Sequence, residues 1–229
     1  PAHERASWRD LIGAVLANPQ ARRFFVYLVL LLAAILGQDV LLEPFAGEAF
    51  DLPVAATTRI TSIWGGFVLV TLILANFLER PLGKRRVAQI GAVSAIAGFL
   101  LIAGSGLVHI SSIFYAGVVF LGLGTGLATV SNLSLMLDMT TSRVGLYIGA
   151  WGIANALSRL IGTVTSGAVR DLITLVSSNA LTGYVVVFFI LAALLVIALF
   201  VLRQVDVQRF RQQTRDLNLS ERAAVMNEV

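Results

Sequence analysis

Long apolar stretches alternate with short polar connections along this chain. Six stretches reach the roughly 20 residues that a helix needs to cross a hydrocarbon core about 30 Å thick. Charged side chains are rare inside them, which favours transmembrane helices over the buried helices of a soluble domain. The predicted spans are 24–43, 58–78, 87–107, 112–136, 145–169 and 181–202.

A shorter amphipathic stretch precedes the first span. Its apolar residues, from Trp8 to Leu16, recur at helical spacing on one face, and Arg5 and Arg9 lie beside them. This pattern predicts a short helix in the membrane interface or, equally well, a linker helix packed on a neighbour. Pro19 is expected to end that helix.

Composition places the chain among integral membrane proteins. Hydrophobic residues make up 57% of it and charged residues 13%, which is too apolar for a water-soluble domain of 229 residues. There is no cysteine, so disulfides, thiolate metal sites and cysteine nucleophiles are excluded. Because the chain begins at Pro1 rather than Met, we expect a processed product or a piece of a longer protein.

Basic residues are concentrated in alternate connections. They occur in the amino-terminal arm, at 78–86 and in the tail, whereas the intervening connections carry only Arg59 and Arg170. Cytoplasmic loops carry the excess of Lys and Arg, so both termini are predicted to be cytoplasmic. The net charge of +4 follows from this asymmetry and implies no nucleic-acid partner. The predicted regions are a cytoplasmic linker (1–21), a six-helix transmembrane half-domain (22–203) and a cytoplasmic tail (204–229).

Polar side chains are unevenly distributed among the spans. The first, second, fourth and fifth carry amides, hydroxyls and charges, whereas the third has few and the sixth has none from Val185 to Leu202. This order is expected when two three-helix units each direct two helices to an interior and one to lipid. The predicted fold is therefore all-α, with six transmembrane helices in a 3+3 repeat, as in half of a major facilitator transporter.

The turn between the second and third spans supports that assignment. It reads Glu79-Arg80-Pro81-Leu82-Gly83-Lys84-Arg85-Arg86. This resembles the acidic-Arg-x-Gly-basic signature of the facilitator cytoplasmic turn, with one extra residue before Gly83 and Glu79 in place of the usual Asp. The carboxylate could meet a helix N-terminus, and the basic side chains could complement helix C-termini. Positive-inside residues in a tight turn would explain the same pattern.

Glycines recur at four-residue spacing in the fourth and fifth spans, at Gly122/Gly126 and Gly145/Gly149. Such spacing lets helix backbones approach closely, so we expect these residues to pack against other helices. They lie inside apolar helices rather than between a strand and a helix, which argues against phosphate binding.

Polar and ionisable side chains at the end of the first span are the main functional candidates. Gln38, Asp39 and Glu43 follow an uninterrupted apolar run, where a charge is costly and usually faces an interior or a polar cavity. Asp39 and Glu43 are four residues apart and would share one helical face. They could exchange protons during transport, or pair with Arg159 in the fifth span, and we favour Asp39 with Arg159. Pro44 could also simply end the helix.

Several short motifs occur together in the six-helix region. They are Gln38-Asp39-x-Leu-Leu-Glu43-Pro44-Phe45-x-Gly47, Thr57-Thr58, Trp64-Gly65, and Gly149-Ala150-Trp151-Gly152 with Asn155. Together they resemble the carboxy-terminal half of the PucC/LhaA-like bacteriochlorophyll-delivery family, twelve-helix facilitator-fold proteins of phototrophic bacteria. Arg159 has no match in the family pattern. The resemblance implies a light-harvesting assembly factor of the bacterial inner, photosynthetic membrane whose amino-terminal half is a partner.

The resemblance also implies ligands and partners. A (bacterio)chlorophyll is the expected cofactor, with carotenoid or lipid as further possibilities; light-harvesting or reaction-centre subunits and membrane lipids are expected partners. The magnesium of such a pigment prefers a hard oxygen or nitrogen ligand, and its macrocycle stacks on aromatic rings. Binding candidates are Gln38, Asp39, Glu43, Pro44, Phe45, Trp64, Asn132, Trp151 and Asn155, with His109 as a further ligand candidate. Purely structural roles stay open for some of these residues. His109 could be a solvated or capping residue of an external turn, and the tryptophans could pack between helices.

Two function classes follow. The first is an assembly factor that binds or delivers (bacterio)chlorophyll, antenna subunits or both. The alternative is a proton-coupled facilitator carrier of a small amphipathic solute that uses Asp39 and Glu43. A purely structural subunit of a photosynthetic complex also stays open. The sequence has no Ser-His-Asp set, metal-ligand cluster or nucleotide fingerprint, so we expect no enzyme.

Overall fold

The computed structural model describes residues 19–138 and 144–205, and within these ranges its regular elements are all helices. Six of the helices are long and apolar enough to cross a membrane, which confirms the predicted number of spans. The expected interfacial helix and most of the tail lie outside the described residues. The helices are α2 (Pro19–Gly37), α3 (Leu42–Phe50), α4 (Val54–Leu82), α5 (Lys84–Val108), α6 (Ser111–Asp138), α7 (Val144–Ser177) and α8 (Ala180–Arg203).

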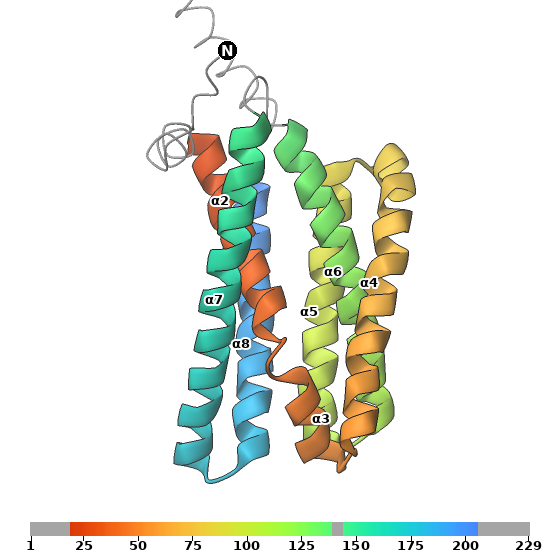
Figure 1. Ribbon diagram of the computed structural model, residues 1–229, viewed down its shortest axis with the longest axis vertical. Coiled ribbons are helices and arrows are strands. Elements are labelled where there is room, and N and C mark those ends of the chain that lie inside the picture. The colour runs from red at the N-terminus through yellow and green to blue at the C-terminus, as the bar shows by residue number, and fades with distance from the viewer. Residues whose placement is uncertain (1–18, 139–143, 206–229) are drawn as a thin grey trace, which may run out of the picture.

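The long helices form two groups of three (Figure 1). In the α6 group, α4 and α5 pack on α6; in the α7 group, α2, α7 and α8 pack on one another. Contacts between α5 and α8 join the groups. The short helix α3 also contacts both groups, through α8 in the α7 group and α4 in the α6 group. The two groups have the same internal arrangement. The first span, α2, contacts the fifth and sixth spans, α7 and α8, just as the fourth span, α6, contacts the second and third spans, α4 and α5. A 3+3 repeat would have this property, and the repeat itself remains a prediction.

The expectation that the third and sixth spans face lipid stays a prediction. These spans, α5 and α8, pack against each other and are about half buried, whereas α4 and α7 are the most exposed. The reason is the small residues of α5. A Cβ atom on Gly91 would lie 2.7 Å from the backbone nitrogen of Ala128, and one on Gly98 would lie 2.7 Å from that of Leu121. Backbone proximity, rather than polarity, therefore places α5 in the core.

The first span is shorter than predicted. Helix α2 begins at Pro19, where a first-turn proline is tolerated, and ends at Gly37 rather than at 43. The Gln38 carbonyl then accepts hydrogen bonds from the amides of Leu41 (2.9 Å) and Leu42 (3.1 Å), which closes a turn. Pro44 does not end a helix, because it lies in the first turn of α3, where its missing N–H has no role.

The basic connection between the second and third spans is tighter than predicted. Gly83, at φ +81°, is the single residue between α4 and α5, and Pro81 lies inside the last turn of α4. The Arg85 guanidinium donates to two carbonyls at the end of α8, at 2.7 and 3.2 Å, and Lys84 pairs with Asp138 at the end of α6, at 2.9 Å. Basic side chains therefore complement helix C-termini, as predicted.

Glu79, the acidic residue of this connection, does not form its predicted contact. The buried Oε1 atom of Glu79 has no hydrogen-bond partner among the described residues, so the predicted contact with a helix N-terminus is not formed there. Arg80 lies exposed in the last turn of the same helix.

The two predicted glycine pairs have different outcomes. Gly122 and Gly126 face α4 closely, since a Cβ on them would lie 2.7 Å from the Trp64 carbonyl and 2.6 Å from the Val68 carbonyl. A Cβ on Gly145 would meet nothing within 4 Å, and Gly149 is exposed. Packing is confirmed for the α6 pair, whereas the α7 pair makes no such contact within the described residues. Helix α7 also continues to Ser177 rather than ending at 169.

Candidate functional site

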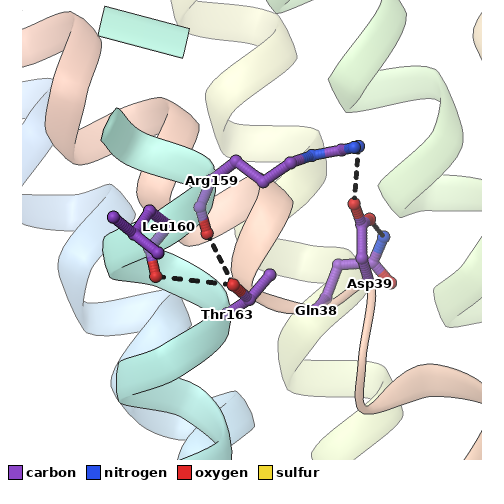
Figure 2. Close-up of polar contacts among 5 residues, drawn as sticks. All are labelled: Gln38, Asp39, Arg159, Leu160 and Thr163. Atoms are coloured by element: carbon purple, nitrogen blue, oxygen red, sulfur yellow. Dashed lines mark hydrogen bonds and ion pairs between the residues drawn. The ribbon is translucent and has the colours of Figure 1, made fainter. Parts of the chain in front are cut away.

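An ion pair joins the turn after α2 to the middle of α7 (Figure 2). Arg159 Nη2 lies 3.0 Å from Asp39 Oδ2 and donates a hydrogen bond to it. Gln38 Nε2 donates to the other oxygen, Asp39 Oδ1, also at 3.0 Å. The pairing favoured from the sequence is therefore present, and both carboxylate oxygens are occupied. We call Gln38, Asp39 and Arg159 the turn site.

Close backbone packing brings these residues together. A Cβ on Gly162 would lie 2.4 Å from the Ala33 carbonyl, and one on Gly37 would lie 2.8 Å from Ser166 Oγ. Since α2 and α7 meet at these glycines, the side chain of Arg159, one turn before Gly162, can reach the turn that follows Gly37.

The site is neither buried nor fully open. The Asp39 side chain is 28% exposed and the Arg159 side chain 63%. Asp39 follows the first span rather than lying in it. Burial raises the pKa of its carboxyl above the ordinary value of 3.8, while the charge and hydrogen bond of Arg159 and the hydrogen bond of Gln38 act in the opposite direction. Desolvation outweighs these attractions.

Gln38 is the most buried member of the turn site. The residue is only 2% exposed, and its Oε1 atom has no hydrogen-bond partner among the described residues. The bond from Nε2 to Asp39 determines which end of the amide is left over. An unpaired buried carbonyl costs about 1–3 kcal/mol, so an additional donor at this point would be stabilising.

Asp39 and Glu43 do not share a helical face, contrary to the prediction. Asp39 lies in the turn and Glu43 in α3, where its carboxylate accepts a hydrogen bond from the Thr61 hydroxyl of α4. The two carboxylates therefore contact opposite groups of helices. The sequence reasoning missed Thr61 as a partner, because helical periodicity carries no information on a contact between separate helices.

Phe45 is not available as a stacking surface for a pigment. It is fully buried, and its ring centroid lies 5.2–6.0 Å from those of four other rings in α3, α6 and α8. Those rings belong to Phe50, Phe114, Tyr184 and Phe188. Phe45 thus attaches α3 to the core, while neighbouring Pro44 is exposed.

The fourth-span amide is also inaccessible. Asn132 is fully buried, as are nearby Ser131 in α6 and Tyr27 in α2. The Asn132 amide lies close enough to the Tyr27 hydroxyl to act on it, although neither of its amide atoms forms a hydrogen bond of regular geometry among the described residues. A large macrocycle cannot reach this amide without separation of the helices, so Asn132 does not serve as a direct ligand in this arrangement.

The remaining candidates lie on α4, α5 and α7. Trp64 in α4 is half-buried, with a buried indole N–H that has no partner among the described residues. Trp151 and Asn155 are half-buried on α7, two turns and one turn before Arg159. His109 is exposed and ends α5 with a left-handed backbone, as expected for a capping residue. In the described ranges, no group of three or more His, Asp or Glu side chains could hold a metal ion.

Comparison with known proteins decides the family. The model of the family described as PUCC protein matches residues 2–210. The chain belongs to the PucC family. It is 34% identical to Protein PucC of Rhodovulum sulfidophilum over 167 residues, which is 72% of this chain and 37% of that protein.

Two further proteins similar to this chain carry other names. The bacteriochlorophyll synthase 44.5 kDa chain of Rhodobacter capsulatus is 28% identical over 80% of this chain and 44% of its own length. Quinolone resistance protein NorB of Staphylococcus aureus (strain COL) is 30% identical over 62% of this chain and 32% of its own. The chain thus spans less than half the length of these relatives. It is a multi-pass membrane protein of the PucC family.

Proposed function

We propose that this chain is half of a light-harvesting assembly factor that binds or delivers (bacterio)chlorophyll, antenna subunits or both in a photosynthetic membrane. The observation that carries the proposal is the turn site: a part-exposed ion pair between the turn after α2 and Arg159, which lies on a helix long enough to span the membrane. Intramembrane charges are rare and usually serve recognition or transport. The name of one relative, a bacteriochlorophyll synthase chain, supports pigment chemistry over other ligands.

The exposed helix faces support a further partner. Helices α4 and α7 are the least buried of the six, and Gly149 and Gly152 of α7 are exposed. Small residues at helix surfaces suit close helix contacts. The chain also spans less than half the length of its relatives. We therefore propose that the amino-terminal half of the same protein covers α4 and α7, with the basic end of the bundle in the cytoplasm and no catalytic role.

The alternative function is proton-coupled transport of a small amphipathic solute. It is favoured by similarity to a quinolone resistance protein and by the carboxyl of Asp39, whose pKa is raised by burial. A carrier needs such a group to bind and release protons during its cycle.

One purification separates the two functions. The full-length protein is isolated in mild detergent from its native host, and its absorption spectrum is recorded beside that of Arg159→Gln. Far-red pigment bands that survive purification and weaken in the variant support the assembly factor. A colourless protein that drives proton-linked solute uptake in vesicles, lost in Asp39→Asn, supports the carrier and refutes the first proposal.

A further inference from the structure

The basic connection between α4 and α5 uses its cations in two different ways. Lys84 pairs with Asp138 at 2.9 Å, and Arg85 donates to two carbonyls at the end of α8. Arg86, the next residue, is exposed and forms no hydrogen bond or ion pair with the described residues. Two of three consecutive cations therefore have structural partners, and the third is available to a ligand.

A second exposed arginine lies beside Arg86. Arg85 Nη2 is 2.7 Å from the carbonyl oxygen of Arg203, which brings the last residue of α8 next to the first turn of α5. Arg203 is exposed, and its guanidinium carbon lies 5.6 Å from the centroid of the Phe200 ring. No carboxylate in the described ranges pairs with it. Two positive charges without described acidic partners therefore lie at one end of the contact between α5 and α8.

The helix faces that continue from these arginines are apolar and accessible. Residues about one and two turns from each arginine lie on the same side of its helix. These positions hold large apolar side chains that are 39–58% exposed, namely Ile90 and Val93 on α5 and Val196 and Phe200 on α8. Such surface is unfavourable in water and favourable against hydrocarbon chains. A ligand with an anionic head and apolar chains would match both the charges and the adjoining faces.

This combination narrows the ligand to an anionic phospholipid. A guanidinium binds phosphate oxygens through paired N–H groups. A soluble anion would contact the arginines alone, and a soluble acidic peptide would leave the apolar faces uncovered. A zwitterionic lipid carries its own cation, which competes with arginine for the phosphate. A lipid whose headgroup has a net negative charge satisfies the arginines and covers the apolar side chains together.

We propose that Arg86 and Arg203 bind the phosphate of one anionic phospholipid, such as phosphatidylglycerol, whose acyl chains lie along the exposed faces of α5 and α8. The inference goes beyond the proposed function and needs neither pigment binding nor transport. Because α5 and α8 join the two groups of helices, the lipid lies where the groups meet. Its binding therefore stabilises the six-helix arrangement.

The test counts lipids on the full-length protein. The protein in detergent is titrated with phosphatidylglycerol or with phosphatidylcholine of the same acyl chains, and bound lipids are counted by native mass spectrometry. We expect one retained phosphatidylglycerol that phosphatidylcholine does not replace. Arg86→Gln and Arg203→Gln should each weaken its binding about fivefold, the effect of one basic residue beside an anionic lipid. The double variant should lose this one lipid and no second.

Two further variants serve as controls. Arg59→Gln removes an exposed arginine at the opposite end of α4 and should retain the wild-type lipid count. Arg85→Gln removes the donor to the α8 carbonyls, so it should lower the thermal unfolding temperature equally in both lipids. Arg86→Gln should lower that temperature only in phosphatidylglycerol. This difference separates a lipid contact from a structural one.

Several outcomes would overturn the inference. Equal retention of the two lipids would do so, as would an effect of Arg59→Gln as large as that of Arg86→Gln. Loss of two lipids in the double variant would show two separate headgroups instead of one shared phosphate. If inorganic phosphate displaces the retained lipid or stabilises the protein as strongly, the ligand is a soluble anion. None of these results bears on pigment binding, which the absorption spectrum tests.

Discussion

The two groups of helices use close packing in different ways. In the α6 group, successive glycines on α5 and α6 face each other, so that Cβ atoms on Gly91, Gly98, Gly117 or Gly124 would meet backbone atoms at 2.5–2.9 Å. In the α7 group, α2 and α7 make such an approach at Gly37 and Gly162, after which α2 ends in the turn site. The α5 and α6 backbones are therefore in contact along much of their length, and we call them the closed pair. The α2 and α7 backbones approach each other closely at one point, which leaves room for charged side chains beside it.

The largest expected effect concerns the closed pair. Gly124→Ala places a methyl group 2.5 Å from the backbone nitrogen of Ala95, so α5 and α6 must separate. We expect destabilisation by about 1–3 kcal/mol, measured as the thermal unfolding temperature of the protein in detergent. The matched control is Gly152→Ala on the open face of α7, which meets nothing within 4 Å. Equal destabilisation by both changes would refute the comparison.

The second effect concerns the turn site. Arg159→Leu leaves the part-buried Asp39 carboxylate without its charged partner, and we expect a loss of about 1–2 kcal/mol, less than for a fully buried pair because both side chains are partly exposed. The double variant Asp39→Asn/Arg159→Leu should recover part of this loss, as measured in a double-mutant cycle of thermal stability. If the cycle shows no coupling between the two positions, the pairing has no energetic role.

A third effect concerns the link between α3 and the α6 group. Thr61→Val removes the hydroxyl that donates to the Glu43 carboxylate, with an expected loss of about 1 kcal/mol. Thr58→Val is the control, because the Thr58 hydroxyl bonds to the Val54 carbonyl of its own helix. Resistance to a protease that cleaves near Asp51 provides the measurement. Equal sensitivity of the two variants would show that the bond does not hold α3.

The smallest expected effect is the pH dependence of the Asp39 to Arg159 pair. Burial raises the pKa of the Asp39 carboxyl, so the ionised form and its pair with Arg159 are present above that raised pKa and are lost as the pH falls through it. Arg159→Leu removes a group that lowers this pKa, so protonation should move to still higher pH. Infrared titration of the carboxyl band, assigned by its absence in Asp39→Asn, measures the shift. A shift to lower pH would contradict the electrostatic account.

Hydrophobic pattern and charge were sufficient for much of the architecture. The number of spans and the capping role of the basic turn follow from run length and from Lys and Arg positions, which are local properties. The Asp39 to Arg159 pair was also predictable, since an unpaired charge in an apolar span requires a partner. Periodicity failed at Gln38 to Leu41, because the turn depends on hydrogen bonds of the Gln38 carbonyl and on the contact between Gly37 and α7.

Sequence alone determined that this chain is a helical membrane protein of the PucC type with charges near the end of its first span. Only the tertiary structure decided which of those residues remain reachable. Phe45 and Asn132 are buried, whereas Arg159 keeps an exposed guanidinium. The physical reason is that residue type sets what a side chain can bind, while the packing of distant helices sets whether a ligand can approach it.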